Sequence, residues 1–332
     1  MPRFFAFSGW VALHTTDPVM LTTVRHKFCR YSPVDTDPGF DWGDSPTLIS
    51  KITLRYFSLG QSVLALLGRQ RFMTAVDNSE QRLAEVGAWL HGAARVVVLT
   101  GAGISTASGI PDFRGPQGLW TRDPEAEKLS DIRYYVSDPV IRRKAWQARR
   151  DSPVWQASPG AGHYALARFE QSGRLHTLVT QNIDGLHQLA GSADERVIEI
   201  HGTLRQVACL QCSYRVAMAV VLKRLADGEE DPDCPDCGGI LKSATISFGQ
   251  SLVAKDLARA EQAARECDLL LAVGSTLLVF PIAGLVPLAH KAGVRVVIIN
   301  AESTAMDDLG DAVLMGDIEL LLPQLIAQSE NQ

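Results

Sequence analysis

Residues 95–105 read Arg95-Val-Val-Val-Leu-Thr-Gly-Ala-Gly-Ile-Ser105, a β-branched apolar run that continues directly into a glycine-rich turn. Such a run is typical of a strand that is buried on both faces. Glycines at the end of the strand permit a tight turn and let backbone N–H groups approach a phosphate, with a helix N-terminus behind them. The stretch therefore predicts the first strand of an α/β domain and a turn that holds a phosphate group.

The same kind of apolar run recurs along the chain. Further strands are predicted at Leu175–Thr180, Val197–Ile200, Asp268–Val273, Val294–Ile299 and Ala312–Met315. Helical patterns lie between several of them, notably at 160–172 and 253–267. Strands that alternate with helices favour a Rossmann-like α/β fold, which is a doubly wound parallel sheet with helices on both faces. We expect this domain to comprise residues 73–204 and 246–328.

The first 72 residues differ from the rest of the chain. They mix aromatic residues, isolated charges and turn-forming residues without a sustained period, as in Pro33-Val-Asp-Thr-Asp-Pro-Gly39. From Met73 the pattern becomes regular, and Asp77-Asn-Ser-Glu80 is suited to cap a helix that runs through Leu90. We expect residues 1–72 to form a poorly ordered N-terminal extension. The alternatives are a targeting arm, or translated upstream sequence with Met73 as the functional start.

Composition places the chain among globular proteins. It has 332 residues, of which 46% are apolar and 21% are charged, and a disordered chain would be less apolar. A net charge of −5 provides no basic field for nucleic acid. No run of 18 or more apolar residues occurs, so no membrane span is expected. We therefore expect a cytoplasmic enzyme that binds neither nucleic acid nor membranes, and the sequence leaves its oligomeric state open.

Four of the six cysteines form two C-x-x-C pairs, Cys209-x-x-Cys212 and Cys234-x-x-Cys237, with 21 residues between the pairs. Each pair presents two thiolates on a tight turn, and together they supply the four ligands of a tetrahedral zinc ion. Because no coordination position is left open, the site is interpreted as structural. A nucleic-acid-binding zinc ribbon is the alternative, but the segment between the pairs is acidic and would repel phosphates. We expect a smaller zinc-binding domain, inserted at 205–245, with a helical part at about 115–160.

The glycine-rich turn departs from the fingerprint of dinucleotide-binding dehydrogenases. Thr106 takes the place of the third glycine of G-x-G-x-x-G, and no acidic residue ends a second strand about 20 residues later. The chain continues instead into a polar, irregular loop, Ser108-Gly-Ile-Pro-Asp-Phe-Arg-Gly-Pro116. A hydride-transfer enzyme holds its nicotinamide ring flat beside the substrate, which such a loop does not favour. A dehydrogenase is therefore the least favoured NAD-dependent function.

Several motifs together resemble the sirtuin family of NAD-dependent protein-lysine deacylases, in its bacterial type with a four-cysteine zinc module. The loop Gly101-Ala-Gly-Ile-Ser-Thr-Ala-Ser-Gly-Ile-Pro-Asp-Phe-Arg-Gly115 is similar to the family's signature loop almost letter for letter. Thr180-Gln-Asn-Ile-Asp-Gly-Leu-His187 also matches, with His201-Gly202 at the usual distance. Further matches are the cysteine pairs, Phe248-Gly-Gln250, Gly274-Ser-Thr-Leu277 and Val297-Ile-Ile-Asn300. The resemblance spans roughly residues 80–325.

The resemblance implies a reaction in which NAD is cleaved to nicotinamide and an acyl group moves from lysine to ADP-ribose. It further implies that Asp184 and the backbone of Ile183 hold the nicotinamide carboxamide, while Asn182 acts at the ribose. His201 is the expected general base, because histidine titrates close to neutral pH. The competing histidines are His163, His176 and His187. Without the resemblance, Asn182 and Asp184 would also fit an Asx turn at the end of a strand.

The resemblance also implies the remaining binding residues, with NAD⁺ as co-substrate and Zn²⁺ as structural ion. NAD is expected to contact Gly101, Ala102, Gly103, Ser105, Thr106, Ile110, Asp112, Phe113, Arg114, Trp120, Gln181, Asn182, Ile183, Asp184, Gly274, Ser275, Thr276, Asn300, Glu302 and Ile318. Among these, Phe113 is expected to shield the reactive sugar from water, and Asn300 and Glu302 to meet the adenosine ribose. The acyl-lysine protein substrate is expected to add a strand along Phe248, Gly249, Leu277 and Val279.

Two departures from the family pattern bear on the substrate. The family often has Glu after Phe-Gly, whereas Gln250 here removes a charge that would pair with a basic peptide. Some members carry Tyr-x-x-Arg for acidic acyl groups, and Trp146-Gln-Ala-Arg149 lacks the tyrosine, which favours acetyl or another neutral acyl group. A protein mono-ADP-ribosyltransferase and a non-catalytic sensor of NAD or O-acyl-ADP-ribose are the alternative functions. His201 favours deacylation, because ADP-ribosyl transfer alone need not activate a ribose hydroxyl.

Overall fold

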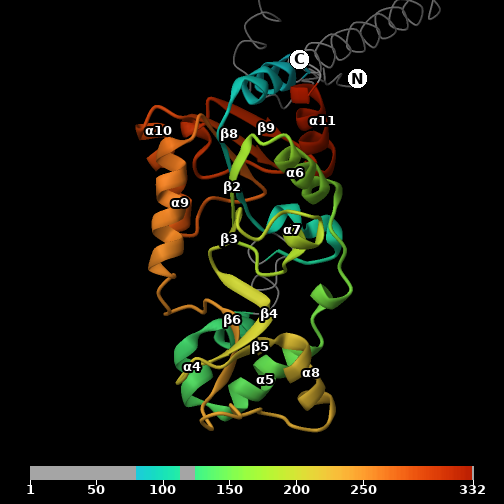
Figure 1. Cartoon of the computed structure of the whole chain (residues 1–332), viewed down its shortest axis with the longest axis vertical. Helices are drawn as coiled ribbons and strands as arrows, with labels where there is room; N and C mark the ends of the chain where they lie inside the picture. The colour runs from blue at the N-terminus through green and yellow to red at the C-terminus, as the bar shows by residue number, and fades with distance from the viewer. Residues whose placement is uncertain (1–79, 113–123, 331–332) are drawn as a thin grey trace, which may run out of the picture. The chain divides into compact units, whose positions relative to one another are not determined.

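The computed structural model describes residues 80–112 and 124–330 (Figure 1). The expected N-terminal extension at 1–72 lies outside the described residues, and so do three residues expected to contact NAD: Phe113, Arg114 and Trp120. Within the described ranges no helix is long and apolar enough to cross a membrane.

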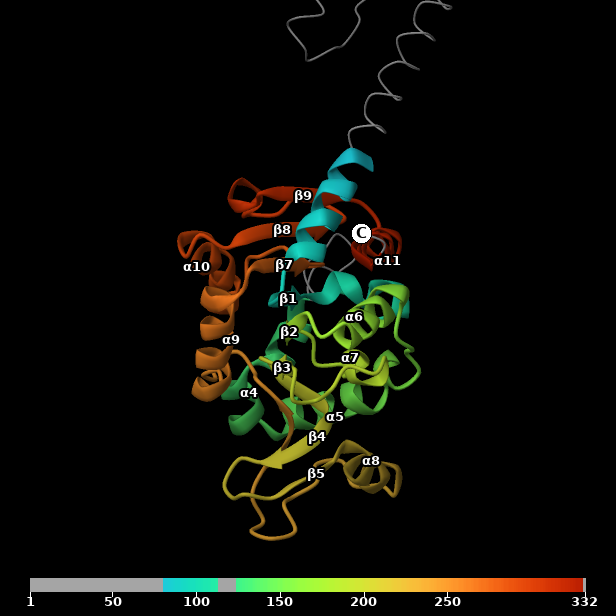
Figure 2. The same cartoon turned by 45° about the horizontal axis from the view of Figure 1, so that its top comes forward.

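A six-stranded sheet in the order β3-β2-β1-β7-β8-β9 is the larger of the two sheets in the described chain (Figure 2). Every neighbouring pair of strands in it is parallel. Its strands are β1 (Val96–Thr100), β2 (Leu175–Thr180), β3 (Val197–Glu199), β7 (Leu269–Val273), β8 (Arg295–Asn300) and β9 (Ala312–Met315). The chain builds outward from β1 to one side and from β7 to the other, so the strand order reverses between β1 and β7. Such a switch point opens a crevice at the carboxyl ends of the strands. The Rossmann-like α/β expectation is confirmed.

Helices cover both faces of this sheet, as Figure 2 shows. On one face lie the helix at 80–92, α6 (Ala161–Gln171) and α11 (Ile318–Glu330), and on the other lie α9 (Ala254–Glu266) and α10 (Leu285–Lys291). The strand side chains alternate between the two layers, so Val96 and Val98 belong to one apolar cluster while Val97 and Leu99 belong to the other. Each such fully buried side chain stabilises the fold by about 1.5–3 kcal/mol.

The segment after β1 is irregular rather than helical. Two short 3-10 turns, η1 (Ala102–Ile104) and η2 (Thr106–Ser108), follow the strand, so no regular helix stands directly behind the glycine turn, and the irregular backbone expected from Ser108 onward already begins here. The run of small polar residues there offers no apolar stripe with which a helix could pack. Gly109 then ends the second turn in the left-handed conformation, with φ of 83°, and Pro111 has no N–H with which to continue a helix.

A second, antiparallel sheet in the order β5-β4-β6 carries the cysteine pairs (Figure 1). Its strands are β4 (Gly202–Cys209), β5 (Arg215–Ala217) and β6 (Leu241–Thr245), and α8 (Met218–Ala226) packs beside them. Val207, Met218 and Val221 form the centre of a separate apolar cluster there. Because β4 starts at Gly202, it crosses the boundary that the sequence analysis places at residue 205. The remaining short elements are η3 (Pro124–Ser130), η4 (Pro153–Trp155), α7 (Leu186–Leu189), η5 (Ile282–Gly284) and η6 (Asp307–Leu309).

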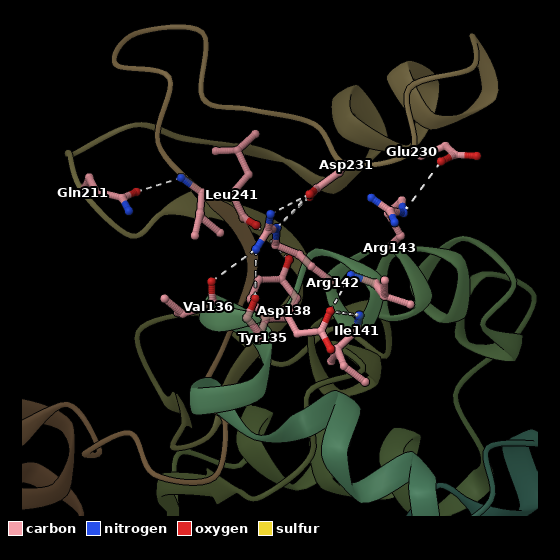
Figure 3. Close-up of polar contacts among 12 residues, drawn as sticks. Tyr135, Val136, Asp138, Ile141, Arg142, Arg143, Gln211, Glu230, Asp231 and Leu241 are labelled. Carbon is pink, nitrogen blue, oxygen red and sulfur yellow. Dashed lines mark hydrogen bonds and ion pairs between the residues drawn. The ribbon is translucent and has the colours of Figure 1, made fainter.

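Two helices from an earlier part of the chain, α4 (Ile132–Ser137) and α5 (Pro139–Arg150), attach to this second sheet (Figure 3). The Arg142 guanidinium binds both carboxylate oxygens of Asp231, with its Nη2 2.7 Å from Oδ2. Its Nη1 donates to the carbonyl of Tyr135, 3.2 Å away, near the end of α4. The Tyr135 hydroxyl donates to the Leu241 carbonyl at 2.8 Å. Polar contacts therefore join α4 and α5 to the cysteine-bearing segment.

We expect Arg142→Ala to lower the free energy of unfolding by about 2 kcal/mol, because it leaves the largely buried Asp231 carboxylate without its charged partner. Arg143→Ala is the matched control on the same helix. Its contact with Glu230 is longer, 3.7 Å, and exposed, so the expected loss is within about 0.5 kcal/mol (Figure 3). Urea denaturation of both variants measures the difference, and equal losses would contradict this account of how the helices are held.

Candidate active site and zinc centre

Two glycine turns meet backbone to backbone at the switch point of the sheet. The N–H of Gly103 donates to the carbonyl of Gly274 at 2.8 Å. A Cβ on Gly103 would lie 2.8 Å from the Gly274 Cα, and a Cβ on Gly274 would lie 2.6 Å from the Ile104 nitrogen. Gly274 also has a φ of +64°, which favours glycine. The glycines that resemble a phosphate-binding fingerprint are therefore required first by the contact between these two turns.

The Ser105 hydroxyl lies directly behind the first turn and connects the two polar residues that follow β2. It donates to Asp184 Oδ2 at 2.9 Å and accepts from the Asn182 amide at 3.0 Å. The Asn182 amide also donates to the Gly101 carbonyl at 3.0 Å, and the other Asp184 oxygen accepts from the Leu186 N–H at 2.9 Å. All three side chains are buried. The structure thus brings together Ser105, Asn182 and Asp184.

Asp184 also makes the Asx-type contact that the sequence alone predicts. Its bond to the Leu186 N–H closes an Asx turn just before α7, and Gly185, the residue between them, has a φ of 70°. One oxygen of the Asp184 carboxylate thus closes the local turn, and the other accepts the hydrogen bond from Ser105. On the other side, Arg205 donates to the Asp184 backbone carbonyl at 3.0 Å, a contact that the sequence analysis does not anticipate.

His201 stands between β3 and β4, at the carboxyl end of the sheet. Its Nδ1 lies 3.0 Å from the Gln181 carbonyl oxygen. Because a carbonyl can only accept, Nδ1 carries the hydrogen and the lone pair of the neutral ring is on Nε2. The His201 carbonyl accepts from the Ile246 N–H at 2.7 Å. Gly202 has a φ of +72°, and any Cβ there would overlap the Ala244 carbonyl. His201 therefore has a fixed backbone and a defined tautomer.

The Gln181 side chain links this end of β2 to the turn after β7. Its Nε2 donates to the Ser275 hydroxyl at 2.9 Å, and the Leu277 N–H donates to the same hydroxyl at 3.2 Å. Leu277 is buried and has a φ of 56°, whereas Thr276 is exposed. Ser275 is thus held from both sides at the carboxyl edge of the sheet.

The residues expected at the adenosine end lie farther along the same edge. The Asn300 amide, at the end of β8, donates to the Glu302 carbonyl at 2.8 Å, and Glu302 itself is exposed. Ile318 is buried in the apolar cluster at the start of α11. It lies close to Gly162 of α6. Ile318 is therefore part of the apolar layer between the sheet and these helices, beside the carboxyl edge of the strands.

The expected substrate segment around Phe248 pairs with the chain just before α4. The Phe248 N–H donates to the Ser130 carbonyl at 2.8 Å, and the Ile132 N–H donates to the Phe248 carbonyl at 3.0 Å. Gly249 follows with a φ of +80°. In the other expected segment Leu277 is buried and Val279 is partly buried. The exposed apolar side chains there are instead Leu278 and Phe280, which the sequence analysis does not single out.

Three further expected NAD contacts lie in the loop after the glycine turn. Thr106 is exposed and its hydroxyl donates to the Gly103 carbonyl at 3.0 Å. Ile110 and Asp112 are partly buried in a segment without regular structure, which leads to the residues that the structure leaves undescribed. None of these three joins the Ser105 network among the described contacts.

Glu199, two residues before His201, is a titratable group that the sequence analysis does not identify. Burial raises its pKa to about 7, and the carboxylates of Asp184 and Asp194 act in the same direction. The Thr203 hydroxyl and Arg205 oppose this rise in pKa. The Glu199 Oε1 atom is buried and has no hydrogen-bond partner. No local pattern marks this residue, because its environment is assembled from several segments.

The two cysteine pairs converge on a single point. The four Sγ atoms of Cys209, Cys212, Cys234 and Cys237 all lie within 4.8 Å of one another, and two of the pairwise distances are 3.6 Å. A tetrahedral zinc ion with Zn–S bonds of about 2.3 Å requires sulfur atoms about 3.8 Å apart. The backbone N–H of Gln211 donates to Cys209 Sγ at 3.3 Å, as suits a thiolate. These four residues fit structural Zn²⁺, and Cys267 packs apart from them in the core.

Comparison with known proteins agrees with this geometry. A family model described as the Sir2 family matches residues 101–281. The chain is 50% identical over 231 residues to NAD-dependent protein deacetylase 2 of Streptomyces coelicolor, a match that covers 70% of this chain and 96% of that protein. It is 40% identical over 255 residues to NAD-dependent protein deacetylase 1 of Pyrobaculum aerophilum, with coverage of 76% and 96%.

Solved structures are similar as well. A Sir2 enzyme structure, solved to explain the mechanism and regulation of these enzymes, matches with a TM-score of 0.68 at 35% identity. The match covers 76% of this chain and 99% of that one. A Sir2 complex with a deacetylated peptide and 3′-O-acetyl ADP-ribose matches with a TM-score of 0.67 at 33% identity, covering 73% and 96%.

We expect Cys234→Ser to lose zinc and to lower the thermal midpoint of unfolding, because three thiolates cannot complete the tetrahedral site that organises the second sheet. Cys267→Ser is the matched control, since that buried thiol lies outside the cluster. Elemental analysis of the purified proteins counts the zinc. Retention of stoichiometric zinc by Cys234→Ser would rule out this ligand set.

We expect Glu199→Gln to stabilise the protein at pH 8 but not at pH 5. The folded-state pKa of Glu199 is about 7, above its ordinary value of 4.5, so the favourable contribution of its neutral form is lost as the pH rises through 7. Glutamine stays neutral, and the expected gain at pH 8 is on the order of 2 kcal/mol. Thermal denaturation at both pH values measures it, beside the exposed Glu195→Gln as control. An equal effect of Glu199→Gln at both pH values would contradict the assignment.

Proposed function

Because the chain belongs to the Sir2 family and is an NAD-dependent protein deacetylase, we propose that His201 is its general base, with Asn182 and Asp184 holding the reacting half of NAD. The enzyme cleaves NAD to nicotinamide and transfers the acyl group of a lysine to ADP-ribose. In this proposal the protein contributes a proton acceptor at a ribose hydroxyl and a buried polar pocket for the nicotinamide carboxamide.

The observation that carries the proposal is the hydrogen bond between His201 Nδ1 and the Gln181 carbonyl. It leaves the Nε2 lone pair as the basic site of the ring, and a base needs that lone pair directed at the proton it removes. Gln181 immediately precedes Asn182, so the segment that orients the base also carries the amide proposed to act at the ribose. The ring and the amide are therefore positioned by the same stretch of backbone.

Asp184 and Asn182 suit the carboxamide and the ribose for a further reason. Both hydrogens of the Asn182 amide are used on Gly101 and Ser105, so this residue offers its Oδ1 oxygen to a ligand. Asp184 is buried beside it with each of its oxygens holding a protein donor. We propose that Asp184 and the Ile183 backbone face the carboxamide, whose amide group supplies donors. The glycine turns at 101–103 and 274–276 are proposed to hold the phosphates.

The substrate is proposed to be an acetyl-lysine segment of a protein, added as a strand between Phe248 and Leu277–Val279. Each segment lies a few residues after one that is hydrogen-bonded to the site. Ile246 donates to the His201 carbonyl, and the Ser275 hydroxyl accepts from Gln181. Exposed Leu278 and Phe280 supply apolar surface for the flanking residues of the peptide. We propose residues 73–204 and 246–328 as the NAD-binding domain and 205–245, with the helical part at about 115–160, as the zinc-binding domain, with β4 extending three residues across the first boundary.

The compartment proposed for the enzyme is the cytoplasm. Its zinc thiolates require reduced cysteines, which a reducing compartment maintains. All five cysteines of the described part of the chain are unpaired.

The test is mass spectrometry of an acetyl-lysine peptide incubated with the purified protein, with and without NAD. We expect NAD-dependent loss of the acetyl group with formation of O-acetyl-ADP-ribose, and a fall in rate of about 10²- to 10⁴-fold in His201→Ala. His176→Ala is the matched control, because His176 is an exposed histidine on β2. Full activity of His201→Ala would remove the proposed base. Consumption of NAD with labelling of the protein and no deacetylation would favour ADP-ribosyl transfer instead.

A further inference from the structure

A small cavity, which we call the α5–β6 cavity, lies where the helices α4 and α5 meet the second sheet. Tyr135 of α4, Trp146 and Arg149 of α5, and Lys242 and Ser243 of β6 are among the residues that line it. The centre of a water-sized sphere has about 10 Å³ in which to move there. The cavity therefore has room for one water molecule or one monatomic ion.

Two positively charged side chains line the cavity without a negative partner. Lys242 is buried and Arg149 is partly buried. Desolvation lowers the pKa of Arg149, and burial together with the positive charge of Arg149 lowers the pKa of Lys242 to about 7. Among the described residues no carboxylate counteracts either of these shifts. Burying two like charges together is unfavourable unless an opposite charge lies nearby.

The acidic groups closest to the cavity cannot supply that opposite charge. Burial raises the pKa of Tyr135, so its hydroxyl stays neutral, and it donates to the Leu241 carbonyl at 2.8 Å. Asp231 acts on the pKa of Tyr135, but both of its oxygens are bound by Arg142 (Figure 3). The described part of the protein therefore leaves the charge of this cavity uncompensated.

The cavity also has more hydrogen-bond donors than acceptors. Trp146 is only 1% exposed, and its indole N–H is buried without a partner. The Arg149 guanidinium has one described hydrogen bond, from Nε to the Ser243 hydroxyl at 3.4 Å, so four of its five N–H groups are still available. Lys242, in contrast, donates to the carbonyls of Ser243 and Thr245, at 3.2 and 2.5 Å. Unused donors beside uncompensated positive charge suit an anion rather than a cation or a neutral ligand.

We propose that the α5–β6 cavity is a binding site for one small monovalent anion such as chloride, which accepts hydrogen bonds from Arg149 and Trp146 while Lys242 adds a second positive charge. The size of the cavity favours a free monatomic ion over phosphate or over a carboxylate with its carbon chain. Anion binding here does not depend on the roles proposed for the NAD-site residues.

An anion in this cavity also bears on the strand that leads to the proposed base. The ammonium group of Lys242 holds the Thr245 carbonyl and lies 3.4 Å from the Thr245 hydroxyl. Thr245 is paired with Gly202, the residue that follows His201. A negative charge that keeps Lys242 protonated thus stabilises the end of β6 that adjoins His201.

The first test is the thermal midpoint of unfolding, Tm, in sodium chloride and in sodium gluconate of the same ionic strength. Gluconate is too large for the cavity and serves as the reference anion. We expect chloride to raise Tm in a saturable way, by about 2–4 °C at ten times its dissociation constant, because it binds only the folded protein. Bromide should act in the same way, and sulfate should have no effect beyond that of gluconate.

Three variants locate the effect, each judged by its own difference in Tm between chloride and gluconate, so that a change in basal stability cancels. We expect Arg149→Gln to abolish the difference. Trp146→Phe removes only the indole N–H and should raise the chloride concentration for half the effect about 10-fold. Arg150→Gln is the matched control, because Arg150 is exposed and paired with Asp151. It should keep the full difference.

Equal Tm values in chloride and gluconate for the parent protein would overturn the proposal, and so would an undiminished difference in both Arg149→Gln and Trp146→Phe. Crystals grown in bromide supply a direct readout. An anomalous scattering peak within hydrogen-bond distance of Trp146 Nε1 is expected, and peaks only at other places would refute the site. Faster turnover of a succinyl-lysine than of an acetyl-lysine peptide, with chloride as a competitive inhibitor, would show that the cavity receives a substrate carboxylate and would overturn the free-ion proposal.

Discussion

The contact between the turn at 101–103 and the turn at 274–276 is the constraint on which the rest of the site depends. Two parallel strands, β1 and β7, end side by side, and their turns touch through backbone atoms because neither has side chains in the way. This close approach positions Ser105, just after the first turn, and Ser275, within the second. Ser105 then bonds to Asn182 and Ser275 bonds to Gln181, so both turns are tied to the end of β2. Larger residues at the glycine positions would push the two turns apart and with them Ser105 and Ser275.

Burying so many polar side chains is tolerated because nearly all of their hydrogen-bonding groups have partners. An unpaired buried donor or acceptor costs about 1–3 kcal/mol, whereas a paired one is close to neutral or mildly stabilising. Ser105 uses its hydrogen and both lone pairs, and Asn182 uses both amide hydrogens. Two exceptions near the site are His187 Nδ1 and Glu199 Oε1, which are buried without a partner, and the pKa of Glu199 is raised to about 7. Ser105 is therefore held in one orientation by its hydrogen bonds, whereas the ionised form of Glu199 is destabilised by burial.

His201 connects the large sheet with the zinc-bearing sheet. Its side chain bonds to the segment after β2, and its backbone bonds to Ile246 just after β6. β4 begins at the next residue and ends at Cys209, a zinc ligand. Zinc at these cysteines would fix the far end of the strand that starts directly after the proposed base. Arg142 and Tyr135 extend this support by fastening α4 and α5 to the same sheet (Figure 3). Zinc bound by the four cysteines would in this way help to hold the base.

By itself the sequence determined the elements and the chemistry that depend on neighbours along the chain. All six strands of the large sheet were predicted to within about two residues, because β-branched apolar runs bounded by turns specify buried parallel strands wherever they occur. The four cysteines were identified as one site because C-x-x-C spacing creates half of a zinc site locally. The His201-Gly202 pair and Asn182-Ile-Asp184 were identified only through their resemblance to the sirtuin motifs, since Asn182 and Asp184 by themselves would also fit an Asx turn. The departure from a regular helix after the glycine turn was also indicated by the sequence, since the local polar run has nothing to pack against.

Only the tertiary structure decided how these groups are oriented. Ser105 bonds to partners 58, 77 and 79 residues away in the sequence, and no local pattern encodes such a contact. The tautomer of His201 depends on Gln181, while the pKa of Glu199 depends on burial among several segments. Hydrogen-bond direction and desolvation are properties of a three-dimensional environment, so they exist only after the strands have been brought together. The residues available to the site can be read along the chain, but their protonation and orientation arise from folding.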